Sequence, residues 1–145
     1  MCTQTPAEAI EVLRRAGLRL STARRIVIEA LFAADRPVSA SELAARLVLE
    51  ESSVYRNLEV LERHGLVRHI HLGHGPGLYA LAANDDTEYL YCERCERATP
   101  LTAHELDGVR ELIRARFGHT PDFSHFAIVG RCADCAALDS AAVRR

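Results

Sequence analysis

Four of the five cysteines in this chain form two pairs of a kind that binds metal ions. Cys92 and Cys95 are separated by two residues, and Cys132 and Cys135 repeat that spacing near the C-terminal end. Four thiolates in such pairs suit tetrahedral zinc, which binds sulfur at about 2.3 Å. A single C-x-x-C pair is also typical of a thioredoxin-like redox site, but here there are two pairs and no βαβ pattern around them. We therefore predict a structural Zn²⁺ with all four cysteines as ligands.

Hydrophobic periodicity predicts the helices that precede the cysteines. They cover residues 7–16, a segment from Ser21 or Thr22 to just before Pro37, a segment that begins at Ser39 or Ser41, and a segment from Ser52 or Ser53 to about His64. In the fourth helix, Val54, Leu58 and Leu61 recur at helical spacing and predict a core-facing stripe. Tyr55 and Arg56 lie off that stripe and are predicted to face elsewhere.

The pattern changes from helical to alternating after Gly65. Residues 66–72 and 78–82 are predicted strands, and the glycine-rich stretch 73–77 is the turn between them. Helices followed by a small hairpin are typical of a winged helix, whose last helix lies in the major groove of DNA.

The second half of the chain is predicted to be a thin α/β layer. Strands are expected at 88–92, 98–102 and 125–132, with an amphipathic helix over 103–117 whose Leu106, Val109, Ile113 and Phe117 face inward. Such a layer forms a poor core alone, which favours a metal and a partner subunit. The predicted fold is thus α+β, with a winged-helix domain over 1–81 and a small dimerisation domain over 82–145.

Composition narrows the class of protein. The hydrophobic fraction of 48% and the charged fraction of 26% are those of an ordinary soluble domain. No apolar run is long enough to span a bilayer and the N-terminus does not resemble a secretory signal, so we expect a cytoplasmic protein without membrane contact. The net charge of −2 is no argument for nucleic acid binding. A zinc site with four thiolates is closed, and no H-E-x-x-H, G-x-S-x-G or P-loop motif occurs, so neither an enzyme nor a small organic substrate is expected.

Three motifs in order resemble the ferric uptake regulator superfamily: S-S-V-Y-R-N-L at 52–58, C-E-R-C at 92–95 and H-F-A-I-V-G-R-C-A-D-C at 125–135. The resemblance covers roughly residues 8–137, and L-V-R-H-I-H-L-G-H-G at 66–75 is similar to the nickel-responsive branch. It implies a homodimer that binds a palindromic operator in double-stranded DNA under metal control. Its implied DNA contacts are Arg19, Ser53, Tyr55, Arg56 and Asn57.

The resemblance also implies a regulatory metal site. The His-rich run that the family usually has before its first C-x-x-C is replaced here by Asp-Asp-Thr-Glu-Tyr at 85–89. The nickel branch instead implies His69, His71 and His125, which would bind Ni²⁺ or a second Zn²⁺ through imidazole nitrogen. His69 and His71 share one face of a strand. The alternative is that both face solvent and that His125 is an ordinary packed residue.

A second implied set consists of Asp86, Glu88 and Asp107, together with His125. Three carboxylates and one imidazole suit a harder ion such as manganese or iron. The alternative is a solvated acidic turn.

Because the usual sensor is altered, other functions stay open. One is a regulator with structural zinc only, constitutive or responding to a non-metal signal. A peroxide sensor is disfavoured, because the oxidisable histidine ligands that it needs are absent from this sequence. A module that binds protein instead of DNA is a further alternative, and its affinity would not vary with salt concentration.

Overall fold

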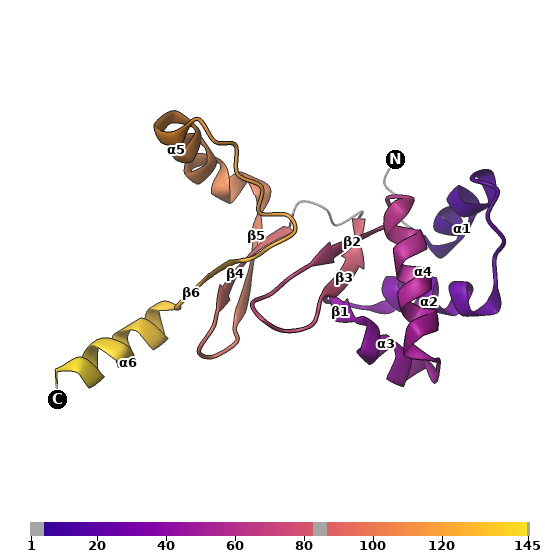
Figure 1. Cartoon of the computed structure of the whole chain (residues 1–145), viewed down its shortest axis with the longest axis horizontal. Helices are drawn as coiled ribbons and strands as arrows, with labels where there is room; N and C mark the ends of the chain where they lie inside the picture. The colour runs from indigo at the N-terminus through magenta and orange to yellow at the C-terminus, as the bar shows by residue number, and fades with distance from the viewer. Residues whose placement is uncertain (1–4, 83–86, 145) are drawn as a thin grey trace. The chain divides into compact units, whose positions relative to one another are not determined.

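The structure of the chain is a computed structural model that describes residues 5–82 and 87–144. These residues form two compact units (Figure 1). One unit runs to Ile70 and resumes at Pro76, and the other combines His71–Gly75 with the residues from Thr87 onward. The sequence predicts one boundary after residue 81, whereas here a short segment inside the hairpin packs with the second unit. In the described ranges, no helix has the length and apolar character needed to cross a membrane.

Four helices make up most of the first unit: α1 (Pro6–Arg15), α2 (Thr22–Ala33), α3 (Ala40–Leu47) and α4 (Glu51–Arg63). Thr5, Ser21 and Ser39 cap the first three, each accepting a hydrogen bond from the backbone amide three residues later. Such caps satisfy amides that have no partner within the helix. Ser21 and Ser39 are thus the N-caps of α2 and α3, and each is one of the two candidates predicted from the sequence.

The start of α4 differs from the prediction of a serine cap. The helix begins at Glu51, ahead of both serines, and has no side-chain cap. Val48 ends α3 in the left-handed conformation, with φ 54° and ψ 49°, so the connection to α4 is tight. The acidic Glu51 in the first turn favours a helix start there, because the N-terminus carries the positive end of the helix dipole.

A small antiparallel sheet closes the first unit. Its strands are β1 (Val38–Ser39), β2 (Val67–Ile70) and β3 (Leu78–Leu81), in the order β1-β3-β2. The predicted hairpin pairs His69 with Tyr79, while the two-residue β1 was not predicted. The predicted stripe of α4 is fully buried and packs with α1, α2 and α3 in one core. Helices followed by this hairpin are a winged helix.

The second unit is built on the strands β4 (Thr87–Cys92), β5 (Ala98–Thr102) and β6 (Ile128–Gly130). β4 lies in the middle, antiparallel to β5 and parallel to β6. The predicted helix over 103–117 is divided into a 3-10 turn, η2 (Ala103–Leu106), and the helix α5 (Asp107–Phe117). The last strand is shorter than predicted and is followed by an unpredicted helix, α6 (Ala133–Val143).

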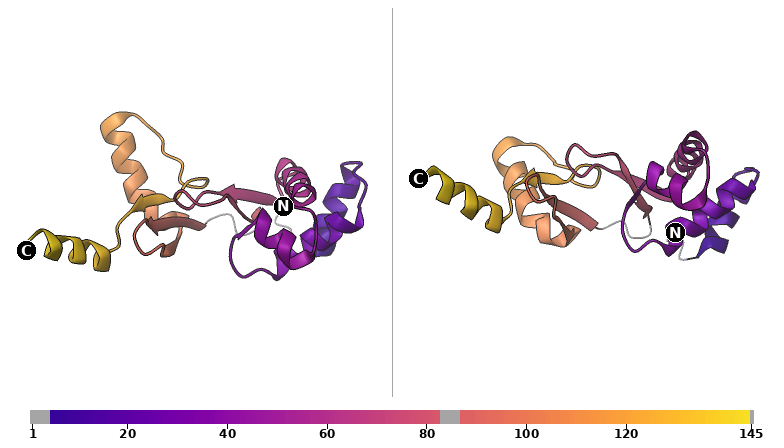
Figure 2. Two further views of the ribbon diagram at one scale, coloured as in Figure 1. Left: turned by 60° about the horizontal axis from the view of Figure 1, so that its bottom comes forward. Right: turned by 90° about the horizontal axis from the view of Figure 1, so that it is seen from below.

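The apolar face of α5 is not covered within one chain. Leu106, in η2, is buried as predicted, but α5 itself has no buried residue and Phe117 is 72% exposed. The prediction that Val109, Ile113 and Phe117 face inward is therefore wrong for the described residues, because periodicity marks an apolar face but carries no information on what covers it. Figures 1 and 2 show α6 leading away from the sheet of this unit.

The tip of the hairpin is part of the second unit through backbone pairing. The amide of His71 donates to the carbonyl oxygen of His125 at 2.8 Å, and the amide of Ala127 donates to the carbonyl oxygen of His71 at 3.0 Å. Close packing adds to this, because a Cβ atom on Gly73 would lie 2.5 Å from the ring of Tyr91. The strand that carries His69 therefore continues directly into a segment paired with residues 125–127.

Candidate functional site

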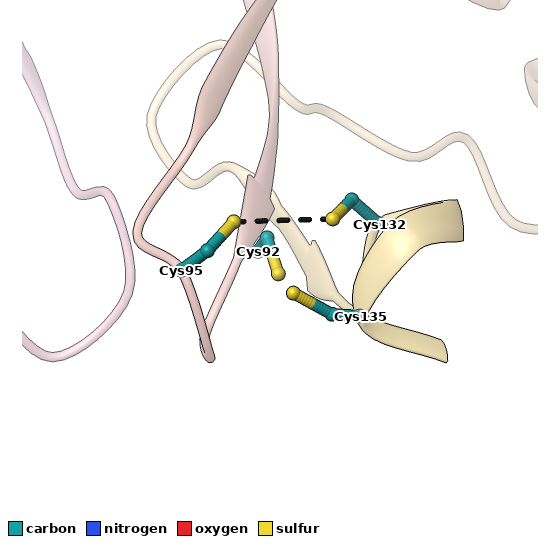
Figure 3. Close-up of side chains that lie close together, drawn as sticks. All are labelled: Cys92, Cys95, Cys132 and Cys135. Atoms are coloured by element: carbon teal, nitrogen blue, oxygen red, sulfur yellow. Dashed lines mark hydrogen bonds between the residues drawn. The ribbon is translucent and has the colours of Figure 1, made fainter. Parts of the chain in front are cut away.

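The four paired cysteines come together in the second unit. Cys92 ends β4, Cys95 lies in the following turn, and Cys132 and Cys135 lie at the start of α6 (Figure 3). Their sulfur atoms all lie within 4.8 Å of one another, and the Cys95 and Cys132 sulfurs are 3.8 Å apart. A tetrahedron with ligands at about 2.3 Å has edges of about 3.8 Å, so this donor set fits zinc. The described cysteines are all free thiols, which leaves each sulfur available as a ligand.

Backbone geometry holds the first pair in place. The amide of Glu96 donates to the carbonyl oxygen of Cys92 at 2.8 Å, and the amide of Cys92 donates to the carbonyl oxygen of Arg97 at 2.9 Å. Glu96 adopts a positive φ of 61°, which reverses the chain within one tight turn. Both cysteines of the first pair therefore belong to one hydrogen-bonded turn.

The sulfurs interact strongly with one another and with nearby amides. Hydrogen bonds from the backbone amides of Cys132 and Cys95 lower the pKa of Cys92 to about 6. Hydrogen bonding to the Cys132 thiol, followed by burial, raises the pKa of Cys135 to about 12. Four thiolates cannot all be ionised at such close range without a cation, so occupation by a metal requires proton release.

Ion pairs attach α6 to the turn that carries Cys95. Arg94 and Arg131 both pair with Asp139, and Arg97 pairs with Asp134 at 3.4 Å. These contacts lie around the cysteines and orient the helix that carries two of them.

The predicted histidine set gathers at the hairpin. The rings of His71 and His125 lie edge to face with centroids 5.1 Å apart, and their nearest ligand atoms are within 4.8 Å. His69 precedes His71 by two residues, and their ring nitrogens lie within the same limit. The His69 ring stacks on Tyr79 at 4.7 Å and lies directly over the backbone of Gly77.

The predicted DNA-contacting residues all lie on the first unit, and they differ in how exposed they are. Tyr55 and Arg56 are exposed on α4, as is Arg19 before α2, while Ser53 is half-buried. Asn57 differs, because it is only 6% exposed.

Asn57 is instead tied into the protein. Its Oδ1 accepts a hydrogen bond from Nε of Arg24 at 3.1 Å, and its Nδ2 donates to the carbonyl oxygen of Ser53 at 2.9 Å. Arg24 also donates to the carbonyl oxygen of Arg19 at 2.6 Å. Arg24 was not predicted as a functional residue, and its only signal in the sequence was its place in the first turn of α2.

The carboxylates of the second predicted metal set lie around an arginine. Glu88 and Asp107 both form ion pairs with Arg110. Asp86 lies outside the described residues. Within the part of the chain that the structure describes, Glu88, Asp107 and His125 do not form one of the gathered ligand groups.

Comparisons with known proteins agree with this architecture. The sequence pattern of the ferric uptake regulator family matches residues 15–124. The chain is 27% identical over 136 residues to a ferric uptake regulation protein of Neisseria meningitidis, which covers 88% of this chain and 93% of that protein. It is 25% identical over 134 residues to the peroxide operon regulator of Bacillus subtilis, with 89% and 92% covered.

Solved structures show the same fold. The ferric uptake regulator of Helicobacter pylori superposes with a TM-score of 0.72 at 18% identity, over 91% of this chain and 94% of that chain. The manganese-containing regulator of Pseudomonas aeruginosa gives a TM-score of 0.65 at 22% identity, over 86% and 98%. The predicted α+β fold is thereby confirmed, and so is the expectation that the chain is a regulator rather than an enzyme. This chain belongs to the ferric uptake regulator family.

Proposed function

We propose that this chain represses transcription as a homodimer on palindromic double-stranded DNA, and that nickel or zinc held by His69, His71 and His125 controls its binding. The observation that carries this proposal is the pairing of His71 with His125 at the end of the winged-helix hairpin. Thiolate ligands stay reduced in the cytosol, which is where such a regulator acts.

Cys92, Cys95, Cys132 and Cys135 would hold a structural zinc ion. A site with four protein ligands leaves no open position for chemistry, so the ion supplies cross-linking alone. The residues around it serve to fix β4 and α6 together. This role suits a unit whose own apolar core is small.

The three histidines would hold the regulatory ion. Imidazole nitrogens favour nickel and zinc over manganese or calcium, which bind oxygen ligands. His69 and His71 lie on one strand of the hairpin, and His71 is already paired through its backbone with the segment that carries His125. An ion held by these three imidazoles would couple metal binding to DNA binding, because His69 belongs to the hairpin of the winged helix.

The exposed face of α4 would contact DNA. Tyr55 and Arg56 project from it, and a planar guanidinium can bind phosphate or the edge of guanine. Arg19 would add a phosphate contact from the loop before α2. Ser53 and Asn57 support this face through their hydrogen bond to one another.

A second copy of the chain would cover the apolar surface of the second unit. On α5 and the neighbouring sheet the exposed apolar residues are Leu90, Val109, Leu112, Phe117 and Val129. Large exposed apolar surfaces of this kind mark interaction sites.

The test uses protein that carries one zinc ion per chain. Its affinity for labelled DNA is measured by fluorescence anisotropy as Ni²⁺ or Zn²⁺ is added. We expect DNA affinity to rise roughly 5- to 150-fold, the usual range of allosteric coupling. His71→Ala should abolish the rise, since it removes the imidazole but leaves both backbone hydrogen bonds. His74→Ala is the matched control, because His74 is exposed in the same hairpin and lies outside the gathered group.

A second candidate function is regulation with structural zinc alone. It is favoured by the arginine that lies between Glu88 and Asp107, where a second metal was predicted. Under this alternative, added metal leaves DNA affinity unchanged and His71→Ala has no effect.

A further inference from the structure

Glu88 is an acidic side chain buried in the second unit. It lies on β4, the central strand, and its side chain is only 6% exposed. One carboxylate oxygen pairs with Arg110, and the other is buried without a hydrogen-bond partner among the described residues. A carboxylate in such surroundings requires a compensating cation, because an unpaired buried charge is very costly.

Arg110 supplies that cation from α5. Its side chain is 17% exposed, and besides Glu88 it donates to Asp107 at 3.2 Å and to the carbonyl oxygen of Ala103 at 2.8 Å. Its guanidinium also lies over the ring of Phe123, 5.5 Å from the centroid. One side chain therefore ties together β4, η2, the first turn of α5 and the segment that leads to His125.

This arrangement does not fit the predicted divalent metal. A metal ion would need the oxygens of Glu88 and Asp107 directed at one point, but the guanidinium already lies between them. Glu88 raises the pKa of Arg110 further, first by hydrogen bonding to it, so the guanidinium stays charged at every physiological pH. The ligand groups that do gather among the described residues are the cysteines and the histidines.

We propose that Arg110 is a resident cation that takes the place of a divalent ion between Glu88 and Asp107. The second unit is then held in shape at this position without metal, and this carboxylate set does not sense metal. A fixed guanidinium cannot be removed by a chelator, so its contacts persist whether or not the histidines hold an ion. This role of Arg110 does not depend on the proposed function, because it follows from the contacts among Glu88, Asp107 and Arg110.

The experiment starts from full-length protein with His69→Ala and His71→Ala, which removes the histidine site. Mn²⁺ is the probe, since it prefers carboxylate oxygens to imidazole or thiolate. Binding is measured by titration calorimetry and by the Mn²⁺ dependence of thermal unfolding. In this background we expect no stoichiometric Mn²⁺ binding at the carboxylates.

Arg110→Gln in the same background should create a cation site. We expect Mn²⁺ affinity to increase at least tenfold and the unfolding temperature to rise with added Mn²⁺, as a ligand of the native state requires. Glu88→Gln added to Arg110→Gln should abolish both effects. Arg114→Gln is the matched control, because Arg114 lies one turn further along α5 and forms its ion pair with Glu111 instead.

Two results would overturn the inference. One is stoichiometric Mn²⁺ binding by protein that keeps Arg110, if Glu88→Gln then abolishes this binding. The guanidinium would in that case not exclude the ion. The other is an Arg110→Gln protein that Mn²⁺ neither binds nor stabilises. These outcomes are independent of whether nickel or zinc changes DNA binding, so failure of this inference and failure of the proposed function are distinguishable.

Discussion

Arg24 and Asn57 are joined by a hydrogen bond of 3.1 Å between α2 and α4, although 33 positions separate them in the sequence. The resemblance to the family implied that Asn57 contacts DNA, but its side chain is buried and both of its polar atoms have protein partners. We infer that it orients α4 and Arg24 for binding.

Asn57→Ala should therefore weaken both stability and DNA binding. Removing a buried partner costs roughly 1–3 kcal/mol, because Arg24 loses an acceptor. Urea unfolding measures the first effect, and anisotropy with several operator sequences measures the second, which should be uniform across sequences. Asn57→Asp keeps the acceptor and is the control. Unchanged stability with altered sequence preference would instead indicate a direct base contact.

Arg56→Ala tests the exposed face of α4. If Arg56 neutralises a phosphate, the variant should bind DNA more weakly, and the slope of log affinity against log salt should decrease by about 1. Arg114→Ala removes an exposed arginine from α5 and should leave the slope unchanged. An equal loss in both variants would point to net charge rather than to a contact.

Gly77→Ala tests the position of His69. An added Cβ would lie 1.9 Å from Nε2 of His69, so the imidazole must move. We expect the metal-dependent rise in DNA affinity to fall by an order of magnitude or more. Gly75→Ala is the matched control, since its nearest neighbour would be a carbonyl oxygen 3.8 Å away. A full metal response in Gly77→Ala would exclude His69 as a ligand.

If Cys92, Cys95, Cys132 and Cys135 hold a structural zinc ion, its removal should unfold the second unit selectively. Structural zinc contributes about 10 kcal/mol or more in small domains, and the unit has few other buried apolar groups. Hydrogen exchange of the Cys132→Ser variant should show loss of protection in β4–β6, with protection retained in α1–α4, which share a separate core. Cys2→Ser is the control, because Cys2 belongs to neither pair. Retained protection in all strands would contradict a structural role for the metal.

Val48→Gly should stabilise the first unit. Val48 is a β-branched residue in the left-handed region and is 90% exposed, so its side chain gains little packing in return for its strain. The expected gain is about 1 kcal/mol in urea unfolding, after the entropy lost by glycine is subtracted. Val48→Ala keeps a Cβ atom and should gain less. Destabilisation by glycine would show that the valine side chain contributes to folding.

The features predicted correctly from the sequence depended on local periodicity and on chemistry at fixed spacing. The buried stripe of Val54, Leu58 and Leu61 is of this kind, and so is each C-x-x-C pair, since both patterns are recognised from residues a few positions apart.

The features that were missed depended on partners far along the chain or on patterns without periodicity. The ion pair between Arg110 and Glu88 cannot be predicted from sequence spacing, because the two residues belong to different elements. The helix α6 is rich in alanine and lacks an apolar stripe, so periodicity gave no signal although alanine is the best helix former. The exposure of the apolar face of α5 could not be predicted either, because periodicity does not say what packs against such a face.

The pairing of His71 with the segment 125–127 has a consequence for exchanging parts between such regulators. The five residues from His71 to Gly75 lie within the hairpin along the chain but pack with the other unit. A chimera joined after residue 81 would carry those residues away from the backbone groups that pair with them. To transplant the DNA-reading portion intact, residues 71–75 must match the recipient rather than the donor.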